Sequence, residues 1–143
     1  TMPHHPFQAV HFSLLLAAAL LSGCGGSDAP ETGTVSGTIT VNGKPVEGIQ
    51  VKFVPEAQVR PSVGTTNAEG EYTTKLTEQT AGVALGPCVV QFFYYPGESS
   101  QNILPAKYNE AAADNPDLNL TVPDDGIVFD YDITVDGEFP PSE

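Results

Sequence analysis

Two aspartates near the end of the chain have the residue type and spacing that acid–base chemistry uses. Asp130 and Asp132 are two residues apart in a segment, 127–135, that alternates apolar and polar side chains. On a β-strand such residues share one face and lie about 6–7 Å apart. Paired carboxylates at this separation hydrolyse glycosides when burial keeps one of them protonated. Because this pair is predicted on an outward face with no aromatic platform beside it, we expect a solvated strand face rather than a catalytic pair.

A second group of carboxylates could supply oxygen ligands to calcium. Asp124 and Asp125 precede Gly126, and Asp114 and Asp117 lie nearby in the sequence. Calcium takes about six to eight oxygen ligands from a shaped loop, and the D-x-D-x-D-G spacing of an EF-hand is absent here. Asp-Asp-Gly before a strand is more typical of a turn. We therefore favour a turn, keep calcium at Asp124 and Asp125 as the weaker alternative, and expect no cofactor.

Histidine would be the usual base for nucleophilic catalysis. His4, His5 and His11 all precede Cys24, in a segment predicted to be removed, and the chain after Cys24 contains neither histidine nor tryptophan. A Ser-His-Asp or Cys-His mechanism would then lack its base, and a zinc site its commonest neutral ligand. We expect a protein that is not an enzyme.

The predicted removal follows from an apolar run that ends on a cysteine. Val10 to Leu21 reads VHFSLLLAAALL, shorter than the roughly 20 residues that span a bilayer and typical of a signal peptide. The next residues, Leu21, Ser22, Gly23 and Cys24, resemble the lipobox of bacterial lipoproteins. This resemblance implies thioether lipidation of Cys24, cleavage before it, and fatty-acyl chains such as palmitate on the mature N-terminus. An ordinary secretory signal, or a buried helix with an incidental cysteine, is the alternative.

The chain divides into four predicted parts. Residues 1–23 are the lipoprotein signal peptide, 24–32 a flexible tether, 33–136 a folded domain and 137–143 an acidic tail. The tether is small, polar and Pro-containing, as a flexible linker should be. Gly25 follows Cys24 where an aspartate would favour inner-membrane retention in some bacteria. We expect a lipid-anchored protein of the cell membrane, or of the outer membrane where there are two, with its domain outside the cytoplasm.

Charge narrows the list of partners. All five basic and all eighteen acidic residues follow Cys24, so this part of the chain carries the whole net charge of −13. Such a charge repels phosphate backbones and anionic lipid headgroups. Nucleic acid is therefore not expected as a partner, and the domain should stand off the membrane on its tether.

After the tether, side chains alternate with a period of two, which predicts β-strands. Asn42-Gly43 between two such segments is a strong hairpin signal. The strand at 87–95 is apolar on both faces except for Gln91, so we expect it near the centre of a sheet. Residues 77–86 and 96–116 are predicted loops, with one helical turn possible at 110–114. The predicted strands cover 33–41, 46–55, 61–66, 71–76, 87–95, 118–122 and 127–135.

Four side chains on these strands could have chemical or binding roles. Cys88 lies on the inward face, and we expect a buried core residue rather than a reactive thiol. Phe93 and Tyr95 share the second face, where exposed rings would form a platform for a sugar or a partner protein; we expect the 96–116 loop to cover them. Lys52 could form an isopeptide bond with an asparagine only if it were buried beside a carboxylate, and alternation places it outward.

Two longer segments identify a family resemblance. GTVSGTITVNGKPVEGIQVKFVP, followed by TTNAEGEYTTKL, resembles the carboxypeptidase regulatory-like domain, a transthyretin-like sandwich. The shared features are the G-x-I-x-V strand at 37–41, the turn at 42–48, and T-x-A-x-G-x-Y at 66–72. The resemblance covers about residues 33 to 135. It implies a non-catalytic module, with roles such as folding support, adhesion or sugar binding.

The sequence therefore predicts an all-β, transthyretin-like or immunoglobulin-like β-sandwich of about seven strands. We expect a non-enzymatic, lipid-anchored cell-envelope protein that acts as a binding or structural module. Its expected partners are the membrane, through the lipid, and an envelope protein or polysaccharide. The alternative is a carbohydrate-binding module that uses Phe93 and Tyr95.

Overall fold

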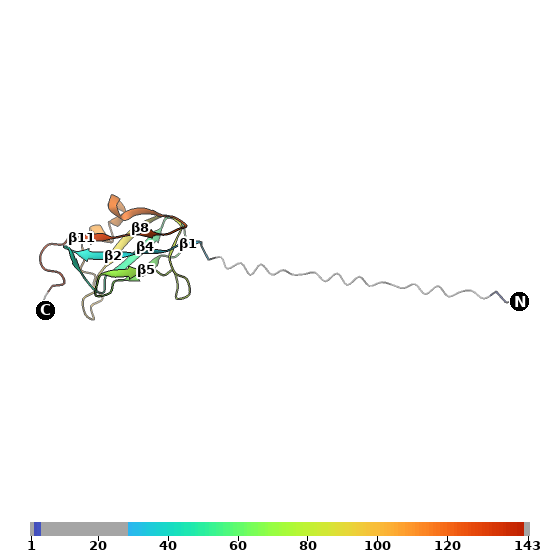
Figure 1. The fold of residues 1–143 in the computed structure, drawn as a ribbon, viewed down its shortest axis with the longest axis horizontal. Coiled ribbons are helices and arrows are strands. Elements are labelled where there is room, and N and C mark those ends of the chain that lie inside the picture. The colour runs from blue at the N-terminus through green and yellow to red at the C-terminus, as the bar shows by residue number, and fades with distance from the viewer. Residues whose placement is uncertain (1, 4–28, 142–143) are drawn as a thin grey trace.

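The structure is a computed structural model that describes residues 2–3 and 29–141 (Figure 1). Cys24 and the other lipobox residues, like nearly all of the predicted signal peptide, lie outside the described residues. Among the residues that are described, no helix has the length and apolar character needed to cross a membrane.

The described chain is all-β and forms a β-sandwich, as the sequence predicted (Figure 1). Its only helices, within the described ranges, are three single 3-10 turns. The strands are β1 (Thr32–Gly33), β2 (Val35–Val41), β3 (Lys44–Pro45), β4 (Gln50–Pro55), β5 (Ser62–Thr65), β6 (Glu71–Thr73), β7 (Val83–Ala84), β8 (Gly86–Phe93), β9 (Asn119–Val122), β10 (Ile127–Val128) and β11 (Tyr131–Ile133). The 3-10 helices are η1 (Ala106–Tyr108), η2 (Ala112–Asp114) and η3 (Pro116–Leu118).

The first sheet is antiparallel and has the strand order β5-β4-β8-β9. β8 lies between β4 and β9, which confirms the central position predicted from its two apolar faces. Phe53 of β4 lies opposite Val90, and Val51 lies opposite Phe92. All four side chains are buried, so these cross-strand pairs stabilise both the sheet and the core.

The second sheet is built around β2. This strand pairs in parallel with β10 and β11, and antiparallel with β6 and β3. The turn between β2 and β3 has φ of 50° at Asn42 and 81° at Gly43. Two successive positive φ angles are the signature of a type I′ hairpin turn, so the Asn-Gly hairpin prediction is confirmed. A separate two-stranded sheet pairs β1 with β7.

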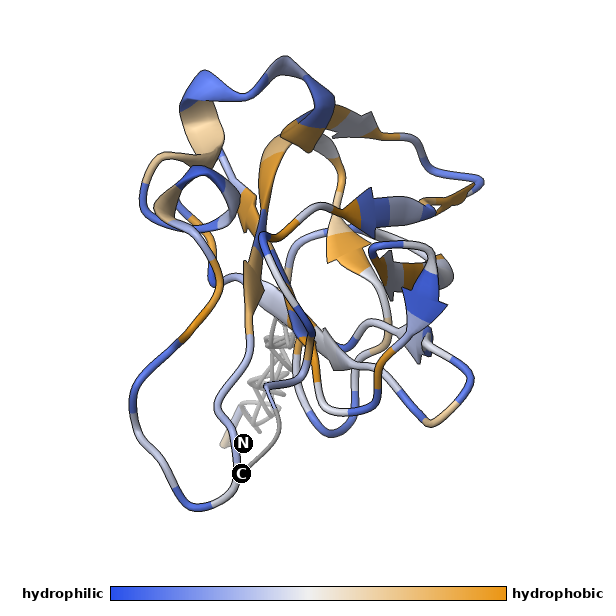
Figure 2. Cartoon of the chain, turned by 90° about the vertical axis from the view of Figure 1, so that its left-hand side faces the viewer, coloured by the Kyte–Doolittle hydropathy of each residue, from blue (hydrophilic) through white to orange (hydrophobic). Residues whose placement is uncertain are grey.

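The core lies between the two sheets and is filled by the inward side chains of each strand. Figure 2 shows the apolar segments concentrated on strands and the hydrophilic ones on the outer loops. The alternation read from the sequence fixes which side chains enter, because successive residues of a strand point to opposite faces. The largest fully buried side chains are Phe53, Phe92, Ile39, Ile49, Leu118, Ile133, Val35, Val41, Val51, Val83, Val90 and Val122.

The closing strand differs from its prediction. The sequence predicted one strand over 127–135, whereas the structure contains β10 and β11, with a break in pairing at Phe129 and Asp130. Both short strands keep one register on β2, since Ile127 lies opposite Val35 and Tyr131 opposite Ile39. The carbonyl group of Phe129 fills the space that a Cβ on Gly37 would need. Side chains continue to alternate between the two faces across the break, but the ladder of paired residues with β2 is interrupted there.

The two predicted loops also contain regular structure. Residues 77–86 include β7. This strand pairs with β1, the short strand that precedes β2. Within 96–116, the helical turn predicted at 110–114 is η2, while η1 was not predicted. These turns lie against β8, where Asn109 bonds to the carbonyl of Phe92.

The start of the predicted acidic tail packs on the domain. Phe139 is half-buried and its ring centroid lies 5.0 Å from that of Tyr94. The side-chain amide of Asn42 donates to the carbonyls of Val135 and Gly137 at 3.0 and 3.4 Å. Residues 135–137 thus lie against the Asn42 turn.

Candidate functional site

The paired aspartates occupy the seam where the broken strand meets β2. Asp130 Oδ1 accepts from the backbone N–H of Thr38 at 2.7 Å. Asp132 Oδ1 accepts from the Thr40 hydroxyl at 2.7 Å and from the N–H of Gly43 at 2.8 Å. Both carboxylates are exposed, so neither has the burial that a proton donor in glycoside hydrolysis requires. The two carboxylates accept hydrogen bonds from β2 and from the turn that follows it.

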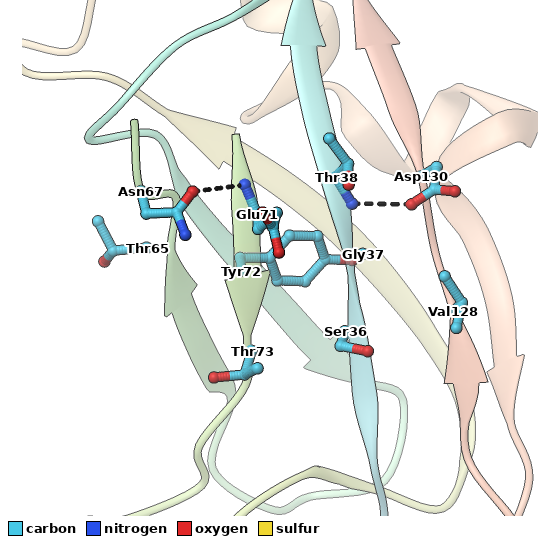
Figure 3. Close-up of a pocket in the computed structure, with 10 residues that line it drawn as sticks. All are labelled: Ser36, Gly37, Thr38, Thr65, Asn67, Glu71, Tyr72, Thr73, Val128 and Asp130. Carbon is cyan, nitrogen blue, oxygen red and sulfur yellow. Dashed lines mark hydrogen bonds between the residues drawn. The ribbon is translucent and has the colours of Figure 1, made fainter. Parts of the chain in front are cut away.

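A shallow pocket lies beside this seam (Figure 3). Its floor is Gly37 and Tyr72, and its rim includes Glu71 on one side of β2 and Asp130 on the other (Figure 3). Glu71 and Asp130 both flank Thr38, Glu71 by antiparallel pairing and Asp130 through its hydrogen bond. The pocket offers hydroxyl groups and the exposed carboxylates of Glu71 and Asp130.

Tyr72 stabilises the break in the strand from below. Its hydroxyl donates to the carbonyl of Phe129 at 2.7 Å. Burial first, and the negative charge of Asp130 second, raise the pKa of Tyr72 above its ordinary value. A tyrosine held protonated in this way is a permanent hydrogen-bond donor. Tyr72 therefore holds the carbonyl of Phe129 at the break between β10 and β11.

Cys88 is buried on the inner face of β8, as predicted. Burial, with a smaller contribution from the charge of Glu56, raises the pKa of Cys88 to about 11. Because the thiolate is the reactive form of cysteine, this thiol is poorly reactive at neutral pH.

The candidate calcium ligands lie in a turn. Asp124 and Asp125 are exposed, and the turn closes through the N–H of Gly126, which donates to the Pro123 carbonyl at 3.1 Å. Gly126 has φ of +79°, a conformation that favours glycine. Among the described residues, no group of three or more potential metal ligands is brought together. The favoured interpretation of Asp-Asp-Gly as a turn is confirmed.

The structure brings Phe93 and Tyr95 together on the outer face at the end of β8. Their rings are parallel within 1°, with centroids 6.3 Å apart. Each is half-buried, and neither belongs to the cluster of side chains that packs around the core. The 96–116 segment was expected to cover them as core. It contacts β8, but its Tyr108 packs on the inner side, against Phe92. The rings contact each other and retain part of their exposure.

The rings border a row of uncharged polar side chains. Gln50 of β4 lies opposite Phe93, and Thr65 of β5 lies opposite Gln50. Both Gln50 and Thr65 are exposed. The outward residues that the strand register pairs across this sheet include no aspartate or glutamate; they are Val63, Thr65, Gln50, Lys52, Val54, Val89, Gln91, Phe93, Asn119, Thr121 and Pro87. The face is therefore free of carboxylates on its paired positions, although the chain has eighteen acidic residues.

Lys52 lies on this same outer face, as predicted. Its cross-strand neighbours are Val63 and Gln91, neither of which is an asparagine. An isopeptide bond also needs a buried lysine, and Lys52 is only half-buried. This geometry does not favour the bond.

Two asparagine side chains hold the loops through hydrogen bonds that were not predicted, Asn42 in its predicted turn and Asn109 after η1. Asn109 is buried; its side-chain amide contacts the carbonyls of Phe92, Leu104 and Pro105 at 3.0 to 3.3 Å, and its Oδ1 accepts from the N–H of Glu110. Asn42 bonds in both directions to the chain around Val135. An uncharged polar residue in an apolar stretch such as ILPAKYN was the available signal for Asn109, since buried amides need partners.

Comparison with protein-family models, with curated proteins and with solved structures finds no match to this chain.

Proposed function

We propose that the protein is a non-enzymatic, lipid-anchored module of the cell envelope that acts by binding or by structure. The observation that carries this proposal is that its chemically capable side chains serve the fold. Asp130 and Asp132 accept hydrogen bonds across the β2 seam, Tyr72 donates to a backbone carbonyl, and burial raises the pKa of Cys88 to about 11. The resemblance to the carboxypeptidase regulatory-like domain, a family of mostly non-catalytic modules, supports the same conclusion.

The lipid anchor rests on Leu21 to Cys24. Domain structure begins soon after it, because β1 starts at Thr32. We expect cells that express the chain to incorporate an alkyne analogue of palmitate into it, and the N-terminal peptide to begin at a modified Cys24. A Cys24→Ser variant should lose the label and leave the detergent-rich phase. A matched Cys88→Ser variant should keep the label. Label that persists in Cys24→Ser would overturn the lipoprotein assignment.

A second candidate function is carbohydrate binding, and the parallel rings of Phe93 and Tyr95 favour it. Aromatic rings offer apolar area and a polarised face to the C–H groups of a sugar, while Gln50 beside them offers an amide for its hydroxyls. We expect the tyrosine fluorescence of the chain to change on addition of a bound polysaccharide, and Tyr95→Phe to reduce this change. Crosslinking in intact cells separates the candidates: a protein neighbour supports an assembly module, and a glycan adduct supports sugar binding.

A further inference from the structure

The chain enters the fold at one end of the sandwich. Thr32 pairs with Ala84, and the carbonyl of Glu31 accepts from the N–H of Leu85, the residue before β8. β1 therefore lies beside the start of β8. Figure 1 shows β1 at one end of the domain and β11 toward the other.

The aromatic pair lies at the opposite end. β8 runs eight residues from Gly86 to Phe93, and at a rise of about 3.3 Å per residue it covers about 25 Å. Tyr94, next to the pair, contacts Phe139 near the C-terminal end of the described chain. The long axis of the first sheet thus separates the entry of the chain from Phe93 and Tyr95.

Chain length limits where a lipid on Cys24 can hold this domain. Eight residues lead from Cys24 to Thr32, and eight residues span at most about 28 Å when fully extended. The β1 end is therefore the end held near the membrane. Adding the length of β8, the aromatic pair can stand up to roughly 50 Å from the lipid attachment point.

Charge selects the ligand that this distant end can accept. The chain carries a net charge of −13, which repels polyanions such as phosphate-rich or uronic-acid polymers. Around the rings, however, the paired outward positions hold amides, hydroxyls and one lysine, with no carboxylate. An uncharged sugar chain loses nothing to this repulsion, and it suits a surface of rings and neutral hydrogen-bonding groups.

We propose that the protein is a two-ended linker that holds a neutral glycan on the Phe93–Tyr95 face, at the end of the domain opposite its lipid anchor. This inference rests on the lipid anchor and on the carbohydrate candidate proposed above. It adds the orientation of the glycan-binding face relative to the membrane. The membrane that holds the lipid lies at the β1 end, and the glycan lies beyond the other end. Since lipid and glycan attach at opposite ends, both can be bound at once.

The test compares vesicles that carry the domain anchored at its N-terminal end with vesicles that carry it anchored at its C-terminal end. In one preparation, Cys24 of the mature chain is coupled to a maleimide lipid in phosphatidylcholine vesicles. In the other, Cys24→Ser carries the same lipid on a cysteine appended after Glu143. That cysteine is five residues from Phe139 and so within about 18 Å of the ring-pair end. Buried Cys88 stays unmodified in both preparations. Sedimentation with one of three uncharged insoluble glycans, namely amorphous cellulose, chitin or a β-1,3-glucan, then measures the vesicles carried down.

We expect the Cys24-coupled vesicles to sediment with at least one of these glycans about tenfold more than the inverted ones, because many anchored copies bind together only when their sites face outward. Phe93→Ala with Tyr95→Ala should abolish sedimentation, whereas Val128→Ala, which shortens an exposed apolar side chain on the second sheet, should not. Circular dichroism checks that each variant is folded.

Sedimentation of the unanchored chain with the same glycans separates the two levels of the proposal. If the unanchored chain binds and both vesicle preparations sediment equally, the orientation is wrong while carbohydrate binding stands. If the unanchored chain binds none of the three glycans, the carbohydrate candidate is itself rejected, and the linker with it.

Discussion

The outer faces of the two sheets differ in charge and in what their side chains do. On the second sheet, Glu71, Asp130 and Asp132 line β2, and the two aspartates bond to backbone and hydroxyl groups. On the first sheet, the paired outward positions carry no carboxylate, and Phe93 and Tyr95 pack on each other outside the core cluster. The face that looks more reactive in the sequence is needed by the fold. The face whose paired positions carry no carboxylate is the one on which we propose that a ligand binds.

The difference follows from strand pairing. The first sheet is antiparallel, so its backbone groups bond to each other along continuous ladders. The second sheet ends in a parallel strand that breaks at Phe129, where Thr38 bonds to an aspartate side chain in place of a backbone carbonyl. Side chains on that face therefore complete the hydrogen bonding, and no such demand is made of the rings on β8.

A large loss of stability is expected at Gly37, where β2 and the carbonyl of Phe129 leave no room for a side chain. Gly37→Ala places a methyl group against the carbonyl of Phe129, and such overpacking should lower the free energy of unfolding by about 3 kcal/mol. Urea unfolding followed by circular dichroism measures this loss. Ser36→Ala on the same strand adds no atom and should stay within about 0.5 kcal/mol of the parent. A Gly37→Ala protein as stable as its parent would show that the two strands do not approach this closely.

Burial of Cys88 on the inner face of β8 should make the stability of the protein depend on pH. Because the fold raises the pKa of Cys88 to about 11, above the usual value of a cysteine thiol, the native state keeps a proton that the unfolded chain loses. The thiol's contribution is complete below about pH 9 and is lost as pH rises toward 11, at up to about 1.4 kcal/mol per pH unit. The parent should therefore lose stability relative to Cys88→Ala across this window. Parallel curves for the two proteins would mean that the thiol is not shielded.

The seam aspartate should have a smaller effect. Asp132→Ala removes the acceptor for the Thr40 hydroxyl and for the N–H of Gly43, and should lower the free energy of unfolding by about 1–2 kcal/mol. Asp132→Asn keeps an amide oxygen and should lose less. Asp125→Ala, at an exposed turn carboxylate, should lose within about 0.5 kcal/mol. Equal losses for Asp132→Ala and Asp125→Ala would place Asp132 on a merely solvated face.

These contrasts also mark how far the sequence could predict the molecule. Alternation and turn chemistry are local, so β2, β4, β8 and the Asn42-Gly43 hairpin could be predicted. Which strands pair is not local: nothing in the alternation at Ile127 indicates a parallel partner 92 residues earlier, or that Asp130 would replace a backbone acceptor. The pairing of Phe93 with Tyr95 was predictable from their spacing. Their remaining exposure was not, because it depends on where the 96–116 segment packs.

The smallest effect on stability is expected at the aromatic pair, and β8 contains its own matched control. Phe92 and Phe93 are neighbours on one strand with opposite faces: Phe92 is fully buried, and Phe93 is half-buried outside the core cluster. Phe92→Ala should lower the free energy of unfolding by about 3–5 kcal/mol through the cavity that it leaves. Phe93→Ala should cost about 1 kcal/mol or less, since it removes partial burial and one ring contact.

Urea unfolding of the two single variants measures this difference directly. If Phe93→Ala costs as much as Phe92→Ala, the ring belongs to the core, and the outer face of β8 offers no platform for a sugar. If the two differ as expected, the fold does not require Phe93, and any loss of glycan binding in Phe93→Ala reports on the surface rather than on unfolding. The same substitution then separates the face that holds the fold together from the face that is free to bind.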